Sequence, residues 1–506
     1  MFLGLDIGTS GVKAVLVNEF QQLVAQANAP LAVSRPQPDW SEQDPESWWQ
    51  ACIDVIRELD KSCPTGLNNV QAIGLSGQMH GATLLGRNGQ VLRPAILWND
   101  GRCGAQCQSL EERVPELRKI TGNMAMPGFT APKLLWIAEH EPQIFQQIHK
   151  VLLPKDYIRY RLSGSFGSDM SDAAGTLWLD VGKRKWSPTM LEACGLQLTQ
   201  MPDLYEGSEA SAGLSAEAAQ ILSLPAGIAI AGGGGDNACG AVGIGAVQAG
   251  QSFISLGTSG VYFVANAAFS PNPDRGMHAF CHALPNTWHQ MGVTLSAASC
   301  LDWVAKLTGA ISVDKLIDEI SALQPKPATT LFLPYLCGER TPHNDPNARG
   351  VFFGLSHETT RAELGRSVLE GVAFAFADAQ QALLQGGANI GRTAVIGGGS
   401  RSQLWGEILA SVLNRPLDYL ADGEYGPAFG ASRLARLART GESAAKVCTA
   451  PAITHTQLPN EQWLDHYNGQ LARYRGLYIA LRDSFTNNQA AAKTVAVDKQ
   501  NLRKSS

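Results

Sequence analysis

Short apolar runs that end in glycine recur along the chain, and each predicts a buried strand that enters a tight turn. The first occupies residues 2–17, where two apolar runs flank a Gly-Thr-Ser-Gly turn at residues 8–11. Small residues in such a turn expose backbone N–H groups and hydroxyls, which are the donors that a phosphate chain requires. The stretch therefore predicts a hairpin whose turn binds phosphate.

A second apolar run, within residues 227–240, breaks into four glycines before Asp236 and Asn237. It predicts a buried strand, a tight turn and the start of a helix. Because glycine has no side chain, a bulky ligand can approach the backbone here, and Asp236 can then accept a proton from a ligand hydroxyl. The alternative interpretation is that Asp236 only caps the helix.

Residues 255–262 repeat the N-terminal turn, with Gly-Thr-Ser-Gly-Val identical in both copies. We interpret the copies as two domains of common ancestry, each of which offers a phosphate loop to a shared cleft. Chance similarity of two small-residue turns is the alternative. Ser255 stands where the first copy has Asp6. We therefore expect the first loop to serve phosphate and Mg²⁺, with Asp6 holding the ion through water, and the second to serve phosphate only.

Residues 72–81 predict a strand that runs into a loop containing Met79 and His80. His80 can hydrogen-bond a sugar hydroxyl while Met79 supplies an apolar wall, although a single histidine after a strand also suits a structural role. Asp100 and Arg102 follow a second strand-to-loop segment, and we expect them to pair with each other. Residues 393–402 repeat the strand, glycine turn and helix pattern of the N-terminus.

Two pairs of side chains have the spacing of metal ligands. His278 and His282 are four residues apart, but the segment lacks the glutamate of a zinc protease motif and Phe280 favours a strand. Asp169 and Asp172 are expected in turn and capping roles. The sequence therefore predicts no metal site at either position.

The composition is typical of a globular protein with a small-molecule partner. A chain of 506 residues is too long for one ordinary core, and 44% are hydrophobic and 17% charged. The formal charge of -5 provides no basic surface for nucleic acid or an anionic membrane. Ten scattered cysteines without a C-x-x-C pair, and an N-terminus that reaches Asp6 too soon for a signal peptide, predict a cytoplasmic location. Residues 483–506 have little apolar periodicity and are predicted to form a flexible tail.

The motifs together resemble the FGGY family of carbohydrate kinases. Residues 128–140 fit the first family signature, and residues 350–355, 363–364 and 367–370 fit the second. The resemblance extends from Met1 to about residue 480 and implies an α/β fold of two actin/hexokinase-like (ribonuclease H-like) domains with a nucleotide cleft between them. We place the N-terminal domain, for sugar, phosphate and Mg²⁺, at residues 1–245, and the C-terminal domain, for adenosine and phosphate, at residues 246–482.

Within the family, the chain is most similar to members that phosphorylate D-xylulose, which carry Gln-Met-His-Gly as found at residues 78–81. The resemblance implies in-line transfer of phosphate from ATP, with Mg²⁺, to the 5-hydroxyl of D-xylulose. Asp236 would be the general base. The implied site residues are Asp236 and Asp6 for catalysis, Asp6 for Mg²⁺, Met79, His80, Asp236 and Asn237 for the sugar, Gly8, Thr9, Ser10, Gly257, Thr258 and Ser259 for phosphate, and Gly398, Gly399 and Ser402 for adenosine.

Two alternatives stay open at this point. The first is another acceptor within the family, namely ribulose, gluconate or glycerol. The second is an ATPase of the actin or Hsp70 type that phosphorylates no metabolite, although the Met79-His80 pair and the two signatures argue against it. The sequence leaves the oligomeric state open, a homodimer included.

Overall fold

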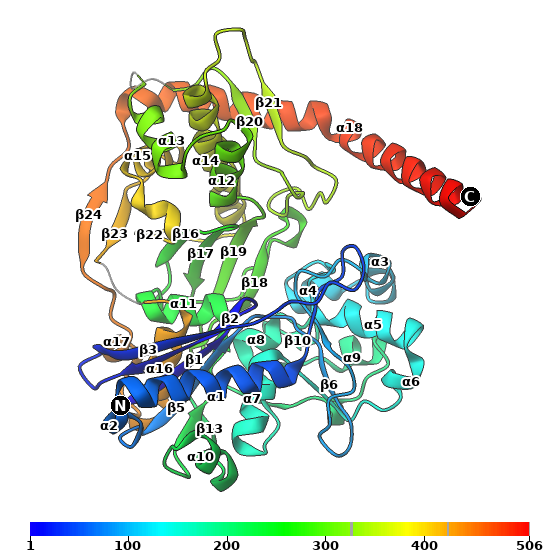
Figure 1. Cartoon of the computed structure of the whole chain (residues 1–506), viewed down its shortest axis with the longest axis vertical. Coiled ribbons are helices and arrows are strands. Elements are labelled where there is room, and N and C mark those ends of the chain that lie inside the picture. The colour runs from blue at the N-terminus through cyan, green and yellow to red at the C-terminus, as the bar shows by residue number, and fades with distance from the viewer. Residues whose placement is uncertain (324–326, 422–424, 505–506) are drawn as a thin grey trace.

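Two α/β domains are stacked along the long axis of the molecule (Figure 1). The computed structural model describes residues 1–323, 327–421 and 425–504, with side chains through residue 486. Each domain is built around a seven-stranded sheet, and a separate hydrophobic core surrounds each sheet. This arrangement confirms the predicted fold class.

The first sheet carries the predicted N-terminal hairpin and the glycine-rich segment before Asp236. Leu3, Leu5 and Ile7 of its strand β1 are fully buried. The strand order is β13-β14-β5-β1-β2-β3, with β15 also paired to β5. The strands are β1 (Phe2–Ile7), β2 (Gly11–Val17), β3 (Leu23–Pro30), β5 (Ala72–Gly77), β13 (Ala210–Gly213), β14 (Ala229–Ala231) and β15 (Gly234–Gly235).

The second sheet repeats the hairpin of the first. Strands β16 and β17 flank the second Gly-Thr-Ser-Gly turn, as the sequence predicts. The strand order is β18-β19-β17-β16-β22-β23-β24. The strands are β16 (Ser252–Leu256), β17 (Gly260–Asn266), β18 (His278–Cys281), β19 (Trp288–Thr294), β22 (Thr393–Ile396), β23 (Leu417–Leu420) and β24 (Ile453–Gln457).

The remaining strands form short two-stranded ladders. They are β4 (Glu42–Gln43) with β7 (Ala95–Ile96), β6 (Thr83–Leu85) with β8 (Lys150–Leu152), β9 (Gly167–Asp169) with β12 (Asp203–Tyr205), β10 (Leu179–Asp180) with β11 (Lys185–Trp186), and β20 (Leu331–Leu333) with β21 (Val351–Phe353).

Helices cover the sheets, and several begin at a capping side chain or a proline, as their sequences predict. Thr360 and Glu363, for example, form a capping box at the start of α14. The helices are α1 (Pro45–Ser62), α2 (Pro64–Leu67), α3 (Gly104–Arg113), α4 (Leu117–Thr121), α5 (Thr130–His140), α6 (Pro142–Phe145), α7 (Pro154–Ser163), α8 (Met170–Ala174), α9 (Pro188–Ala193), α10 (Ala216–Leu222), α11 (Asp236–Ile244), α12 (Ala298–Leu307), α13 (Val313–Ser321), α14 (Arg361–Gln385), α15 (Gln403–Leu413), α16 (Pro427–Thr440), α17 (Ala444–Val447) and α18 (Leu464–Lys504).

Helix α16 comes from the C-terminal half of the sequence but packs on the first sheet, where Figure 1 draws it among the N-terminal strands. Glycines make this approach possible. A Cβ atom at Gly4 or Gly74 would lie 1.9 Å or 1.8 Å from a carbonyl oxygen of α16, and a Cβ at Gly430 of α16 would lie 1.8 Å from the Cys239 carbonyl oxygen of α11. Backbones therefore touch on both sides of α16.

Helix α18 runs through most of the segment for which a flexible tail is predicted. Its backbone is helical from Leu464 to Lys504, and residues 505 and 506 lie outside the described residues. Flexibility of the tail therefore stays a prediction. Among the described helices, none has the length and apolar character needed to cross a membrane.

The close contact at Gly430 predicts that this position tolerates no side chain. Gly430→Ala places a Cβ atom against the backbone of α11, so we expect a loss of stability of about 1–3 kcal/mol despite the higher helix propensity of alanine. The control is Gly469→Ala in α18, where a Cβ atom meets nothing within 4 Å. We expect this control to be neutral or slightly stabilising. Thermal and urea unfolding compare the two, and equal stability of both variants would contradict the packing argument.

Candidate active site

Three neighbouring parallel strands of the first sheet end at the same edge. In the ladder of β1 and β5, Asp6 is opposite Ser76, and in the ladder of β15 and β5, Gly235 is opposite Gly77. The carboxyl ends of parallel strands are the usual place for a ligand in an open α/β sheet. The topology therefore brings Asp6, the loop at residues 78–80 and Asp236 together, as the sequence interpretation requires.

Asp6 is buried beside a second acid. Burial, followed by the charge of Asp236, raises the pKa of Asp6 to about 6. Its Oδ1 atom is enclosed and accepts no hydrogen bond from the residues that the structure describes. An enclosed, unpartnered carboxylate oxygen next to another carboxylate is a suitable ligand for a hydrated divalent cation, which needs only one or two carboxylates.

Asp236 is the first residue of α11, and Gly235 occupies the capping position before it. The backbone N–H and the side-chain amide of Asn237 both donate to Oδ1 of Asp236, at 2.7 Å and 2.9 Å. Oδ2 accepts no hydrogen bond from the described residues. Burial raises the pKa of this carboxyl group. Asp236 is thus not the cap of α11, and its Oδ2 is free of described partners on a carboxyl group whose pKa is raised.

Met79 and His80 line the same edge. Met79 is buried against the backbone of Gly235, and His80 has a positive φ of 71°, a strained conformation often found at functional sites. Nδ1 of His80 lies 2.6 Å from the carbonyl oxygen of Gly175, which can only accept, so Nδ1 carries the proton and Nε2 is an acceptor. Burial, followed by the charge of Lys133, lowers the pKa of His80 to about 3.

Helix α5, which carries the first family signature, supports this loop. The buried Nζ of Lys133 donates to the carbonyl oxygens of His80 and Gly128, both at 2.8 Å. The hydroxyl of Thr130 also donates to the His80 carbonyl. The signature thus has a packing role, which holds the strained His80 in place.

In the first turn, the hydroxyl of Thr9 already has partners within the protein. The hydroxyl of Thr9 donates to Oε1 of Gln78 at 2.8 Å and accepts from Nε1 of Trp98 at 2.9 Å. This side chain therefore ties the turn to the sugar loop and to Trp98. The Ser10 side chain is exposed, and the amide N–H groups of Thr9 and Ser10 donate to no described residue. These groups are available to a phosphate, whereas the N–H of Gly8 donates to the carbonyl oxygen of Gly11 and closes the turn.

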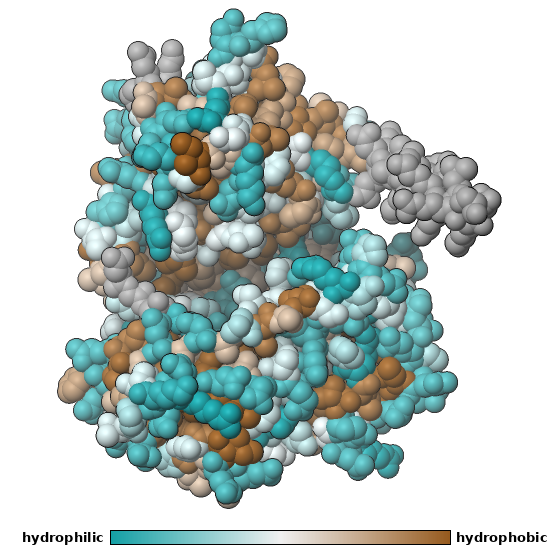
Figure 2. Space-filling model, viewed as in Figure 1, coloured by the Kyte–Doolittle hydropathy of each residue, from teal (hydrophilic) through white to brown (hydrophobic). Residues whose placement is uncertain are grey.

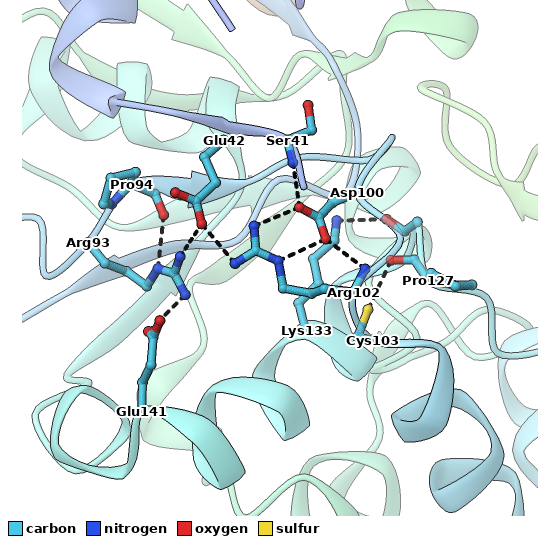
Figure 3. A network of polar contacts seen from close by, with 11 residues as sticks. Ser41, Glu42, Arg93, Pro94, Asp100, Arg102, Cys103, Pro127, Lys133 and Glu141 are labelled. Atoms are coloured by element: carbon cyan, nitrogen blue, oxygen red, sulfur yellow. Dashed lines mark hydrogen bonds and ion pairs between the residues drawn. The ribbon is translucent and has the colours of Figure 1, made fainter. Parts of the chain in front are cut away.

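A buried network begins two residues after Trp98, at Asp100, and Figure 3 shows it in close-up. Nε and Nη2 of Arg102 donate to the two oxygens of Asp100, at 2.9 Å and 2.7 Å, which confirms the predicted pair. The guanidinium of Arg102 also stacks on Trp40, 3.5 Å from the ring centre, and ion-pairs with Glu42. The network fixes the loop that presents Trp98. The role of Trp98 went unpredicted, although an aromatic residue at a strand end is a usable signal.

The second domain places its two glycine turns next to each other. Backbone N–H groups of Ala297 and Ala298 donate to the carbonyl oxygens of Thr258 and Gly257. The hydroxyls of Thr258 and Ser259 stay free of described partners. A Cβ at Gly397 would touch the backbone of Leu256, so the turn that contains Gly398 and Gly399 abuts the phosphate turn. Ser402 caps α15 by accepting from the N–H of Trp405.

A buried lysine with three carboxylates lies behind Asp236. Nζ of Lys155 contacts Asp156, Asp169 and Asp172 at 2.5, 2.8 and 3.2 Å. Asp169 caps α8, as predicted, and also accepts from the hydroxyl of Ser171 at 2.5 Å. Ser171 Oγ in turn accepts from the N–H of Gly235 at 3.1 Å. The cluster therefore anchors the residue before Asp236, a role that sequence spacing of the acids did not reveal.

The two histidines with metal-ligand spacing lie in and just after β18, as predicted. Nε2 of His282 donates to the carbonyl oxygen of Ala246 at 3.2 Å, and burial lowers the pKa of His282 to about 4. Among the described residues, no group of three His, Cys, Asp or Glu side chains could hold a metal ion. His282 is therefore a neutral structural residue.

The low pKa of His282 predicts a pH-dependent contribution to stability. Below pH 6.5 the unfolded chain takes up a proton on this imidazole that the folded chain excludes until about pH 4, so the wild type loses stability relative to His282→Gln as pH falls. We expect the difference in unfolding free energy between the two proteins to shift by about 1.4 kcal/mol between pH 7.5 and 5.5. Urea unfolding at both pH values measures it. The control is His149→Gln at an exposed position. If the difference in unfolding free energy between the wild type and His282→Gln were the same at both pH values, as for the control, the assignment would be contradicted.

Comparison with known proteins adds the family. The N-terminal domain model of the FGGY family of carbohydrate kinases matches residues 1–243, and its C-terminal domain model matches residues 252–439. A protein named xylulose kinase from Escherichia coli (strain K12) is 52% identical over 482 residues, which cover 95% of this chain and 99% of that protein. One of the same name from Bacillus subtilis (strain 168) is 33% identical over 485 residues, covering 95% and 97% of the two chains.

Solved structures agree with this result. A crystal structure described as a xyloylose kinase from Brucella ovis is 51% identical, with a TM-score of 0.93 over 95% of this chain and 99% of that one. A xylulose kinase from Rhodospirillum rubrum is 29% identical, with a TM-score of 0.89 over 96% and 99%. The two-domain α/β fold is thus that of the kinase structures, and the chain belongs to the FGGY family of carbohydrate kinases.

Proposed function

We propose that this protein transfers the γ-phosphate of ATP to the 5-hydroxyl of D-xylulose, giving D-xylulose 5-phosphate and ADP. The observation that carries the proposal is the convergence of Asp6, Met79-His80 and Asp236 at the ends of three neighbouring strands. Relatives with the name xylulose kinase, at 52% identity over nearly the whole chain, favour this acceptor over ribulose, gluconate or glycerol. An ATPase that phosphorylates no sugar would not require the loop at residues 78–80.

Asp236 acts as the general base. Its free Oδ2 accepts the proton of the attacking hydroxyl, while Asn237 holds Oδ1 and so fixes the direction of the other oxygen. Burial makes the carboxylate more basic than an exposed one. A positioned base of this kind typically contributes a factor of about 10²–10⁴ to the rate.

The sugar lies between Asp236 and His80. His80 is neutral, and its Nε2 accepts a hydrogen bond from a sugar hydroxyl, whereas Met79 supplies an apolar wall. The free Oδ1 of the Asn237 amide is the further sugar contact. These side chains orient the acceptor, and orientation is the main source of catalysis in phosphoryl transfer.

The two glycine turns hold the nucleotide. N–H groups of Thr9 and Ser10 in one domain, and of the turn formed by Gly257, Thr258 and Ser259 in the other, donate to phosphate oxygens on which charge builds during transfer. Gly8 closes the first turn by donating its N–H to the carbonyl oxygen of Gly11, and it places no side chain in the way of the phosphate. Adenosine lies against Gly398 and Gly399, where no side chain intervenes, with Ser402 at the edge. The adjacency of this turn to the second phosphate turn supports the placement.

Asp6 fits a hydrated Mg²⁺, because its buried Oδ1 has no hydrogen-bond partner among the described residues and the neighbouring Asp236 adds negative charge. When bound, the ion would offset the charge of the transferring phosphate. Asp6 would hold the ion through water and leave Asp236 free for the sugar. A cytoplasmic location is in keeping with ten free cysteines, eight of them buried, and a homodimer stays a prediction.

The proposal is tested by coupled ADP release with Mg²⁺-ATP, comparing D-xylulose, D-ribulose, gluconate, glycerol and no sugar. We expect turnover to depend on D-xylulose and to fall about 10²–10⁴-fold in Asp236→Asn, because the variant loses its base but not its nucleotide contacts. The control is Asp60→Asn at an exposed position of α1. Equal ADP release with every sugar and without sugar would refute D-xylulose as the substrate. Undiminished turnover in Asp236→Asn would refute Asp236 as the general base.

The anchoring of Gly235 yields a second expectation. Ser171→Ala leaves the buried Gly235 N–H without an acceptor and frees the residue that precedes Asp236, so we expect kcat to fall about 10- to 100-fold while the KM for ATP stays within about twofold. Steady-state kinetics with D-xylulose measures both constants. Ser215→Ala, which removes the N-cap of the distant α10, is the matched control for lost stability. A similar loss of kcat in both variants would mean that Ser171 acts through stability alone.

A further inference from the structure

A loop of the second domain brings a cation to the sugar side of the first. Arg340 is fixed by its backbone: its N–H donates to Glu339 at 2.7 Å, its carbonyl oxygen accepts from the N–H of Asn344, and the next residue, Thr341, donates its N–H to Val293 of β19. The charge of Arg340 lies close enough to His80 to lower the pKa of that imidazole. A Cβ at Gly128 would lie 3.9 Å from Nη2 of Arg340. The guanidinium therefore reaches across to the loop around His80.

The orientation of this guanidinium is set by two further residues. Nη1 of Arg340 donates to Nε2 of His278 at 3.1 Å, so Nε2 is unprotonated and Nδ1 carries the proton. Nδ1 of His278 accordingly donates to Oδ1 of Asn123 at 3.2 Å. Asn123 is itself held, because its amide donates to the carbonyl oxygens of Thr121 and Ala279. Asn123, His278 and Arg340 thus form one directed chain of hydrogen bonds.

The remaining donors of Arg340 are unused. Its Nε and Nη2 atoms donate to none of the described residues. Neither atom is enclosed by the protein, so both are accessible to a ligand. No carboxylate of the described residues forms an ion pair with this side chain. Glu339, the nearest acid, already accepts from the hydroxyl of Thr294 and the N–H of Leu295. An oriented guanidinium without a carboxylate is available to a ligand oxygen.

We propose that Arg340 is a substrate-binding residue of the second domain, which donates to the carbonyl end of the ketose, at O1 and O2. The inference rests on the proposed function. Asp236 takes the proton from O5, Met79 contacts the neighbouring Gly235, and His80 lies one residue beyond Met79. Because Asp236 occupies the O5 end, we assign His80 and Arg340 to the other end of the sugar. The acceptor Nε2 of His80 and the donors of Arg340 complement a hydroxyl next to a carbonyl.

Hydrogen bonds also connect the Arg340 loop to the nucleotide side of the site. Glu339 ties the Arg340 loop to Thr294 and Leu295, and two residues later Ala297 and Ala298 hold the carbonyl oxygens of the second phosphate turn. The Arg340 loop is thereby joined by hydrogen bonds to the segment that positions this turn. His278 is a positioning residue in this arrangement, because it acts through Arg340.

The test compares Arg340→Met and Arg340→Lys with Arg349→Met. Arg349 is an exposed residue of the same loop, and its guanidinium donates to the backbone carbonyl oxygens of Pro346 and Ala348. We expect Arg340→Met to raise the KM for D-xylulose about 10- to 100-fold, because a charged hydrogen bond is lost, with the KM for ATP unchanged. Arg340→Lys keeps the charge and should recover part of the loss. Arg349→Met should match the wild type. Calorimetric binding of D-xylulose without nucleotide checks that the loss is one of affinity.

Substrate analogues locate the contact. 1-Deoxy-D-xylulose lacks O1, and xylitol lacks the carbonyl group. The wild type should prefer D-xylulose, by kcat/KM, over both analogues, and we expect this preference to be smaller in Arg340→Met for at least one of them. His278→Ala should show the same change to a smaller degree. The double variant should show no greater change than Arg340→Met alone. An unchanged KM, or an equal loss with all three acceptors, would overturn the assignment of Arg340. Absence of D-xylulose turnover in the wild type would instead refute the proposed function.

Discussion

The candidate site depends on backbones that touch without side chains between them. Helix α16 lies against Gly4 and Gly74 of the first sheet on one side and against Cys239 of α11 on the other. Because a glycine stands at each contact, there is no compressible side-chain layer, and α11 has little room to slide relative to β1 and β5. Asp236 begins α11 and Asp6 is the last residue but one of β1, so this packing sets the separation of the two carboxylates. It also explains why a helix from the end of the sequence belongs structurally to the beginning.

Buried acids are treated in two different ways in the first domain. Asp156, Asp169 and Asp172 surround the ammonium group of Lys155, which offsets their charge and makes the cluster a structural anchor. Asp6 and Asp236 have no ion pair with a described residue, and burial raises the pKa of both. Two uncompensated carboxylates in one place are costly for folding and useful for binding. The contrast separates the residues that hold the site from those that bind ligand in it. Figure 2 shows that the surface is hollowed between the two domains.

Local patterns predicted the parts of the site that depend on neighbours in sequence. Both Gly-Thr-Ser-Gly turns, the strand and helix around Asp236, and the strand at His278 follow from apolar runs and glycine positions, and the structure has them where expected. What could not be predicted depends on residues far apart in the chain. The hydroxyl of Thr9 is engaged by Gln78 and Trp98, about 70 and 90 positions away, so its use as a phosphate donor could not be judged from the turn. The Lys155 anchor and the packing of α16 were missed for the same reason.

The sugar side of the site is made by both domains, and this has a consequence for water. Around His80, Phe129 comes from the first domain, while His278 and Phe280 come from β18 of the second, with ring centres of His80 and Phe280 6.3 Å apart and those of Phe129 and His278 5.4 Å apart. Neither domain alone encloses a ligand there. Under the proposed function, the apolar ring of Phe280 from β18 displaces water from the acceptor site only when the domains are in this arrangement. Transfer to the sugar, in preference to water, would then depend on contacts between the domains as much as on the base.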